Sequence, residues 1–377
     1  MSKILNIGNR NGIHLENIDK LEESSENIYF NEVYKELVTL TIKIIDSNNI
    51  SDNKLYNTSN NLIGVIGNRG EGKTSTLHNY KKIIEKDLYR DSLDDDLGDI
   101  YEDVEFSFLN VIDPKLIGED QSILEIIISE MFKKINSQIE DSTKSIEESN
   151  IESIFNLFQK VFQNLSVIKN NKKDIYGNYK HKMNLEMLNQ LSSTTNLKKN
   201  IYKLISEYLN IMSEDNSEYE LLIIRIDDVD QELKNVYSMI EKVRKFLIIP
   251  NVVIIMGLHL SQLYETITQE FIKERKVNIE YNITDITGVK EMSEKYLSKL
   301  IPTTNRVSLP SIKRNYLELE FENNSIKNSK EIYEKLANKT GIILIDPQIG
   351  LSPFLPSNLR ELINFIHLLD DLEESEK

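Results

Sequence analysis

Short continuous apolar runs alternate along this chain with longer segments in which apolar residues recur at helical spacing. The runs predict strands at residues 62–66, 106–112, 221–226, 252–256 and 306–310. The run Leu62-Ile-Gly-Val-Ile66 has no polar position, which is typical of a strand buried on both faces of a parallel sheet. Because such strands alternate with helices, we predict a parallel α/β fold.

Helical periodicity fills most of the chain between and after these runs. It predicts helices at residues 28–45, 74–84, 231–246, 260–275 and 289–300, and more helices between 325 and 372, with Pro356-Ser357 opening the last one. Residues 87–105 are acidic and predict irregular structure. The segment from 122 to about 212 is almost wholly helical in pattern, which is long for a crossover connection, so we interpret it as an insertion.

These patterns divide the chain into three parts. We expect an N-terminal helical segment at 1–50, a core at 51–312 with a helical insertion at about 122–215, and a C-terminal helical lid at 313–377. In the insertion, an apolar stripe from Ile151 to Leu165 favours a core-facing helix over a groove for a partner. The segment Lys169 to Lys182 interleaves lysines with tyrosines, which suits single-stranded nucleic acid, although a solvated loop is the favoured interpretation.

Composition narrows the function classes. The 377 residues are 40% hydrophobic and 28% charged, and the most apolar long stretch, 246–260, is interrupted by Pro250 and Gly257, so we expect a cytoplasmic protein with no membrane contact. The absence of cysteine excludes disulfides and thiolate chemistry. The net charge of −16 opposes broad non-specific binding to nucleic acid, but a local basic patch stays open. The five histidines lack ligand-like spacing and predict no histidine metal cluster.

A glycine-rich segment, here called the glycine loop (residues 67–74), follows the first apolar run and precedes a helix. Its sequence, Gly-Asn-Arg-Gly-Glu-Gly-Lys-Thr, fits the pattern G-x-x-x-x-G-K-[ST] at every position. Glycines let successive backbone N–H groups point at one anion, and the helix N-terminus adds positive charge. We expect Lys73 to reach the β- and γ-phosphates of a nucleotide, and Thr74 to place its hydroxyl on Mg²⁺. The expected nucleotide-binding residues are Gly67, Asn68, Arg69, Gly70, Glu71, Gly72, Lys73, Thr74 and Ser75.

Two aspartates follow the run at 221–226. An aspartate at such a strand end holds Mg²⁺ beside the loop threonine, and we assign this role to Asp227. The next carboxylate, Asp228, is the expected general base that polarises the attacking water. Asp230 is better explained as an acidic residue that favours a helix start. Arg225 interrupts the run, and we expect a structural role, at the sheet edge or paired with a carboxylate.

Both motifs together resemble the P-loop ATPases of the additional-strand class, which includes the AAA+, STAND and KAP groups. Four sequences are similar to ATPases of bacterial antiphage defence systems, including the ATPase partner in RADAR: the glycine loop, Val111-Ile-Asp-Pro114, Ile226-Asp-Asp-Val-Asp230, and Tyr296-Leu-Ser-Lys-Leu-Ile-Pro302 followed by Leu309-Pro310. The resemblance covers roughly residues 30 to 370. It implies a P-loop nucleotide-hydrolase core with ATP and Mg²⁺ as cofactors.

The resemblance also implies roles for polar residues outside the two motifs. His259, after the fourth run, matches the position of a γ-phosphate sensor, and a surface or core-satisfied histidine is the alternative. Arg360 in the last helix resembles a lid arginine called sensor 2, and an ordinary solvated arginine is the alternative. Arg306 is a candidate arginine finger supplied to a neighbouring subunit, with Arg275 as its competitor.

The expected function is Mg²⁺-dependent ATP hydrolysis that drives a conformational or oligomeric switch. We expect a homo-oligomer, since the candidate arginine finger acts in a neighbouring subunit. We also expect an effector protein as a partner, because nothing in the residues identifies an effector activity. A nucleotide-binding scaffold without turnover and a P-loop kinase are the alternatives, although the few arginines do not cluster as a kinase lid requires. No N-K-x-D element follows the later strands, so a guanine-nucleotide switch is disfavoured. This interpretation requires the carboxyl group of Asp227 to lie near Thr74.

Overall fold

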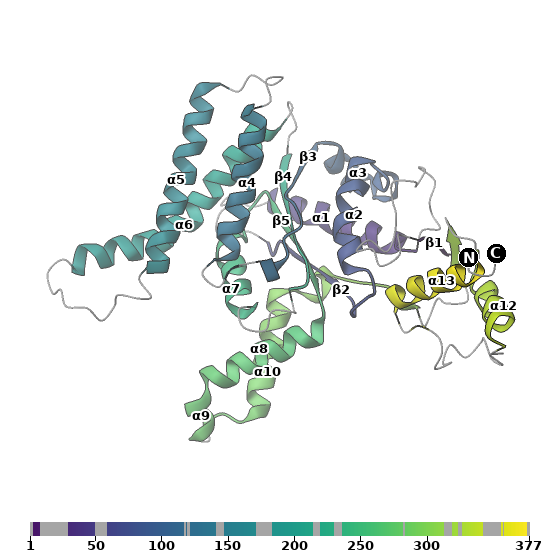
Figure 1. Cartoon of the computed structure of the whole chain (residues 1–377). Helices are drawn as coiled ribbons and strands as arrows, with labels where there is room; N and C mark the ends of the chain where they lie inside the picture. The colour runs from purple at the N-terminus through teal and green to yellow at the C-terminus, as the bar shows by residue number, and fades with distance from the viewer. Residues whose placement is uncertain are drawn as a thin grey trace.

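A computed structural model gives the fold shown in Figure 1. It describes residues 3–7, 29–49, 59–116, 118, 121–140, 147–170, 183–213, 219–229, 236–281, 283–312, 319–322, 326–341, 356 and 358–374. Asp230, the expected helix start near 231, Ser357 and most of the lysine- and tyrosine-rich segment lie outside these residues. No helix in the described ranges is long and apolar enough to cross a membrane.

The core is a five-stranded parallel sheet with the order β3-β4-β5-β2-β6. Its strands are β2 (Leu62–Ile66), β3 (Val104–Phe108), β4 (Tyr219–Ile226), β5 (Val252–Leu258) and β6 (Arg306–Ser308). The predicted parallel α/β fold is therefore confirmed. The chain after β3 stays beside β4, because Leu109 N–H donates to Ile223 and Ile112 forms a bridge with Ile226.

Side chains alternate between the two faces of the sheet, which explains the continuous apolar runs. On β4, Leu221 and Ile223 join the core under α1 (Asn31–Asn49), α2 (Lys73–Glu85) and α3 (Asp95–Glu102). Leu222 and Ile224 point the other way. They pack in the core formed with α4 (Ile123–Glu140), α7 (Val236–Phe246), α8 (Leu260–Glu274) and α10 (Ile286–Leu300). The protein is thus a helix–sheet–helix sandwich.

The expected helical insertion consists of α4, α5 (Glu148–Asn170) and α6 (Met183–Met212). It projects from one side of the sheet beside β4 (Figure 1). The apolar stripe on α5 is mainly core: Ile154, Phe158, Val161 and Leu165 are buried. Phe155 and Phe162 are exposed at 36% and 44%, so the stripe is wider than the buried face.

An N-terminal strand and a strand of the C-terminal region form a second, smaller sheet that the sequence patterns did not indicate. Strand β1 (Lys3–Asn6) pairs in parallel with β7 (Leu319–Glu322), and Leu5 and Phe321 are buried there. The helices α12 (Ser329–Thr340) and α13 (Leu359–Glu374) complete this C-terminal region. Figure 1 shows β1 beside these helices, away from α5 and α6.

The prediction of irregular structure at 87–105 was wrong. This segment contains a 3-10 turn at Arg90–Ser92 and helix α3, with β3 beginning at Val104. Leu97 and Tyr101 of α3 are buried against the core. The many aspartates obscured this short amphipathic helix because they lie on its solvent side. A short helix, α9 (Lys276–Glu280), also separates α8 from α10.

Candidate functional site

The glycine loop connects the carboxyl end of β2 to the first turn of α2. Gly70 and Gly72 have φ of 82° and 108°, a region that disfavours side chains. A Cβ on Gly72 would lie 2.6 Å from Phe30 Cζ, and one on Gly70 would lie 2.6 Å from Asn358 Oδ1. The loop therefore depends on glycine both for its backbone shape and for the close approach of α1 and α13.

Internal hydrogen bonds hold the loop in shape. Lys73 Nζ donates to the carbonyls of Gly67 at 2.9 Å and Asn68 at 3.2 Å. The buried carboxylate of Glu71 accepts the backbone N–H of Asn68 at 2.6 Å and its side-chain amide at 2.9 Å. No side chain of the described residues caps the N-terminus of α2, and its first residues, Lys73, Thr74 and Ser75, line the cavity in front of the loop. This geometry suits an anion.

Asp227 and Thr74 meet at the carboxyl edge of the sheet. The carboxylate of Asp227 accepts a hydrogen bond from the Thr74 side chain and another, at 2.9 Å, from the backbone N–H of Asp228. Burial raises the pKa of Asp227, and the bond from Thr74 opposes this increase. The requirement that these two residues lie together is met.

Gly257 of β5 makes the meeting of Asp227 and the loop possible. A Cβ at this position would lie 2.9 Å from Asp227 Oδ1 and 3.5 Å from Lys73 Cβ. From the sequence, Gly257 was noted only because it interrupts the apolar stretch at residues 246–260. Its role follows from the strand order, which places β5 between β2 and β4.

Asp228 has a different environment from its neighbour. Its φ of 47° lies in the left-handed region, and its carboxylate, whose side chain is 23% exposed, forms an ion pair with Lys115 Nζ at 3.0 Å. Lys115 lies in the 3-10 turn Pro114–Leu116, whose start is fixed by a bond from Lys115 N–H to Asp113 Oδ1. Sequence analysis did not select Lys115. Lys115 directly follows Asp113-Pro114, which ends the second predicted strand. Because the carboxyl ends of parallel strands lie at one edge of the sheet, this position could have indicated that Lys115 lies near Asp228.

These groups surround a cavity of about 180 Å³, here called the loop cavity. The residues that line it are Asn68, Arg69, Gly70, Gly72, Lys73, Thr74, Ser75, Lys115, Asp228 and Arg360. Arg360 arrives from α13, where its backbone N–H donates to the carbonyl of Gly70 at 3.0 Å. The structure thus brings Asp228 and Arg360 together with most of the predicted loop residues, whereas Gly67 and Glu71 do not line this cavity.

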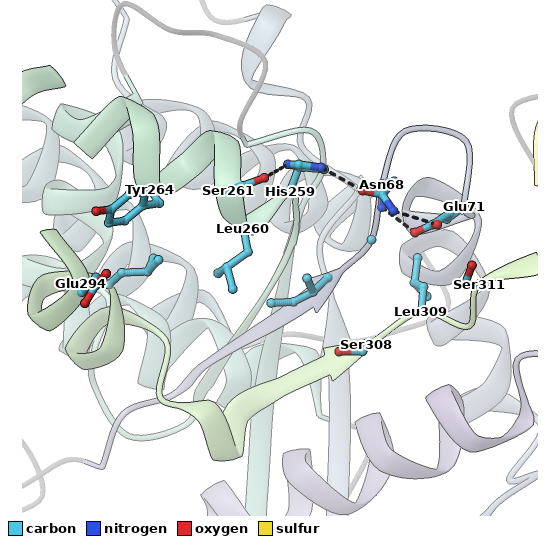
Figure 2. Close-up of a pocket in the computed structure, with 13 residues that line it drawn as sticks. Asn68, Glu71, His259, Leu260, Ser261, Tyr264, Glu294, Ser308, Leu309 and Ser311 are labelled. Carbon is cyan, nitrogen blue, oxygen red and sulfur yellow. Dashed lines mark hydrogen bonds between the residues drawn. The ribbon is translucent and has the colours of Figure 1, made fainter. Parts of the chain in front are cut away.

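His259 touches the glycine loop from the end of β5. It caps α8 by accepting the N–H of Gln262 at Nδ1, and its Nε2 lies 2.9 Å from Asn68 Oδ1 (Figure 2). Since Nδ1 accepts this hydrogen bond, the ring hydrogen lies on Nε2, which donates to Asn68 Oδ1. His259 therefore contacts the loop through Asn68 and does not line the loop cavity itself.

The other arginines lie apart from the loop cavity. Arg306 begins β6, pairs in register with Gly64, and donates from Nε to the carbonyl of Ile301 at 2.9 Å. Arg275 is the C-cap of α8, about 24 Å along the helix from its N-cap His259 at 1.5 Å per residue. Neither residue lines the loop cavity of its own chain. A role of Arg306 or Arg275 in a neighbouring subunit stays a prediction.

Arg225 corrects one expectation. Its strand, β4, lies between two strands and not at a sheet edge, and within the described ranges no ion pair joins Arg225 to a carboxylate. The buried guanidinium donates instead to the carbonyls of Leu77 and Leu109, each at 2.8 Å. Desolvation lowers its pKa to about 10, so it remains charged at neutral pH. The side chain ties β4 to α2 and to the end of β3, which confirms a structural role.

The residues present fit a magnesium ion only together with a ligand. Within the described ranges, no group of three or more His, Asp or Glu side chains could hold a metal by itself. Thr74 and Asp227 offer two oxygen ligands of the type that Mg²⁺ prefers, and Mg²⁺ is usually held by one or two protein groups plus phosphates and water. The donor set is therefore suited to a magnesium-bound phosphate.

No protein-family model and no curated protein matches this sequence. The class that fold and site define is a parallel α/β protein with a glycine loop, two aspartates and two lysines gathered at the carboxyl edge of its sheet.

Proposed function

We propose that this protein is a Mg²⁺-dependent ATPase that uses hydrolysis to drive a conformational or oligomeric switch. The observation that carries the proposal is the hydrogen bond between Thr74 and Asp227, which joins the glycine loop to the end of β4. It brings the two expected magnesium ligands to one site although they lie 153 positions apart in the sequence. Chance matches to a short motif do not explain this convergence.

The strand order supports the same class. β5 lies between the loop-bearing strand β2 and the aspartate-bearing strand β4, which is the position that the additional strand has in the resembled class. Ligands of open α/β sheets bind at the carboxyl ends of the strands, where the glycine loop and both aspartates lie. We therefore propose a P-loop nucleotide-hydrolase core for residues 51–312.

Each residue has a defined task in this proposal. Lys73 and the N–H groups at the start of α2 bind the β- and γ-phosphates. Thr74 and Asp227 hold Mg²⁺, which supplies neutralisation of the charge that develops on the phosphates. Asp228 orients water for in-line attack on the γ-phosphate. Lys115 forms an ion pair with Asp228 in the same cavity. This ion pair has to open before the carboxylate of Asp228 can orient the attacking water.

The lid gives the proposed switch a structural basis. Arg360 N–H donates to Gly70 O, so α13 is bonded directly to the loop that would hold the phosphates. A change between ATP and ADP at the loop then alters the contact with α13.

ATP is proposed over GTP because the chain has no N-K-x-D element after its later strands. The antiphage role, the effector partner and the homo-oligomer are proposals from the resemblance alone.

Two substitutions test the proposal. Lys73→Ala is expected to abolish ATP binding, whereas Asp228→Asn keeps binding and loses turnover, because it removes a base and leaves the phosphate ligands in place. Binding is measured by isothermal titration calorimetry and turnover by phosphate release. Equal rates of phosphate release in the original protein and both variants would rule the proposal out.

The ion pair between Lys115 and Asp228 favours a second candidate, a nucleotide-binding scaffold without turnover. The Lys115 ammonium group, 3.0 Å away, occupies the carboxylate that would have to orient the attacking water. For a scaffold, calorimetry detects ATP binding that depends on Lys73, and no phosphate is released even by the original protein. The same two measurements thus separate the candidates.

A further inference from the structure

A second cavity of about 600 Å³, here called the side cavity, borders the glycine loop (Figure 2). It lies at the carboxyl ends of β2, β5 and β6 and is flanked by α8 and α10. The residues that line it are Ile66, Gly67, Asn68, Glu71, His259, Leu260, Ser261, Tyr264, Glu294, Leu297, Ser308, Leu309 and Ser311. Among these, only Asn68 also lines the loop cavity, so the two cavities adjoin at the glycine loop and share little of their lining.

The side cavity has the size and surface of a small-molecule site. Such sites usually measure about 300–1,000 Å³ and combine apolar walls with a few polar groups. Here Ile66, Leu260, Leu297 and Leu309 supply the apolar surface. Tyr264 adds an aromatic ring at one end (Figure 2). A flat, apolar body therefore suits this space.

Several polar groups at the cavity have no bonding partner among the described residues. They are the carboxylate of Glu294 and the hydroxyls of Tyr264, Ser308 and Ser311. Figure 2 places Glu294 and Tyr264 at one end, and Ser311 at the other. The cavity thus offers an acceptor at one end and hydroxyls elsewhere along its length.

The charges of the lining select against phosphate. Its ionised side chains are Glu71 and Glu294, and lysine and arginine are absent from the lining. Glu71 already accepts two bonds from Asn68, which leaves Glu294 as the exposed charge. By contrast, the loop cavity contains two lysines and two arginines. An uncharged or cationic ligand fits the side cavity, and a nucleotide phosphate does not.

We propose that the side cavity binds an uncharged or cationic heteroaromatic molecule of nucleoside size. Its ring packs on Leu260 and beside Tyr264, and an edge N–H donates to the carboxylate of Glu294. Hydroxyl groups of the ligand bond to Ser308 or Ser311. A ribonucleoside combines these features: a flat base with N–H donors, hydroxyl groups and no charge.

Calorimetry with adenosine, guanosine and cytidine tests this proposal. At least one of them is expected to bind the full chain, and Glu294→Gln is expected to weaken that binding about tenfold or more, because a hydrogen bond to a charged acceptor is lost. Glu291→Gln is the matched control. It lies on the same helix, its side chain is 64% exposed, and it lines no part of the cavity.

Two further titrations separate the side cavity from the proposed ATP site. Nucleoside binding is expected to be unchanged in Lys73→Ala and to persist with saturating ADP and Mg²⁺. Failure of all three nucleosides to bind, equal effects of Glu294→Gln and Glu291→Gln, or displacement by ADP would each overturn the proposal. Because nucleoside binding is read without turnover, these results do not depend on whether the protein hydrolyses ATP.

Discussion

Adjacent aspartates at the end of β4 have separate environments and therefore separate proposed roles. Asp227 is 7% exposed and bonds to Thr74, whereas Asp228 turns toward Lys115. The left-handed backbone at Asp228 directs the two side chains to different partners. A non-glycine residue in such a conformation costs about 1–3 kcal/mol, which surrounding contacts must offset. Strain of this kind at a cavity is consistent with a functional constraint.

Lys115 lines the loop cavity beside the expected phosphate-binding residues. Lys115→Ala is expected to weaken ATP binding about tenfold, because it removes one of the cations that line the loop cavity. Lys133→Ala is the control, since Lys133 is exposed and pairs with Glu130 outside that cavity. Isothermal titration calorimetry with ATP and Mg²⁺ measures both variants. Equal ATP affinities in Lys115→Ala and Lys133→Ala would show that Lys115 does not contribute to nucleotide binding.

The sequence indicated some of these residues and not others for a physical reason. The glycine loop is a local motif, and its meaning depends only on the strand before it and the helix after it. Asp227 was predictable because it ends a buried run. Lys115 and Gly257 reach the site through strand order, which no single segment contains. The partners of Arg225 were unpredictable for the same reason.

At the scale of elements, α1 and α13 hold the glycine loop from two sides. Phe30, just before α1, is fully buried against Gly72, and Asn358 before α13 lies against Gly70. Both contacts come from outside the strand–loop–helix unit. The loop therefore depends on the whole molecule for its shape.

Substitution of Gly72 tests this support. Gly72→Ala is expected to lower the free energy of unfolding by about 3 kcal/mol, because its Cβ would clash with Phe30 at a positive φ. Gly98→Ala, in α3 with open space around it, is expected to raise that free energy by about 0.5–1 kcal/mol. Urea unfolding measures both. A neutral Gly72→Ala would show that the loop tolerates a side chain.

The large elements were predictable and the small ones were not. Long runs and long periodic segments gave the five strands of the main sheet and most helices, because burial on both faces leaves a strong pattern. β1 and β7 are short and pair across almost the whole chain, so neither has a local signal of its own. Their pairing joins residues near the N-terminus to the C-terminal region.

At the scale of the whole molecule, the proposed arginine finger requires a second copy. Arg306 and Arg275 lie outside the loop cavity of their own chain. If either acts in a neighbouring subunit, specific ATPase activity rises with protein concentration. Substitution of that arginine by alanine then lowers the activity of the assembled form by about 10³-fold, as for other arginine fingers. Phosphate release over a dilution series measures this.

The two arginine variants serve as controls for each other. Loss of activity in Arg306→Ala alone assigns the role to Arg306, and loss in Arg275→Ala alone assigns it to Arg275. Normal hydrolysis by both variants at every concentration would contradict a finger from either residue.

We propose above all that Thr74 and Asp227 together hold the magnesium ion of a bound triphosphate. The most direct measurement is the affinity for ATP with Mg²⁺ and with EDTA, in the original protein and in Asp227→Asn, which keeps the shape of the side chain and removes its charge. We predict that Mg²⁺ tightens ATP binding about tenfold in the original protein and that Asp227→Asn abolishes this difference. An Asp227→Asn variant whose ATP affinity responds to Mg²⁺ as the original does would contradict the account.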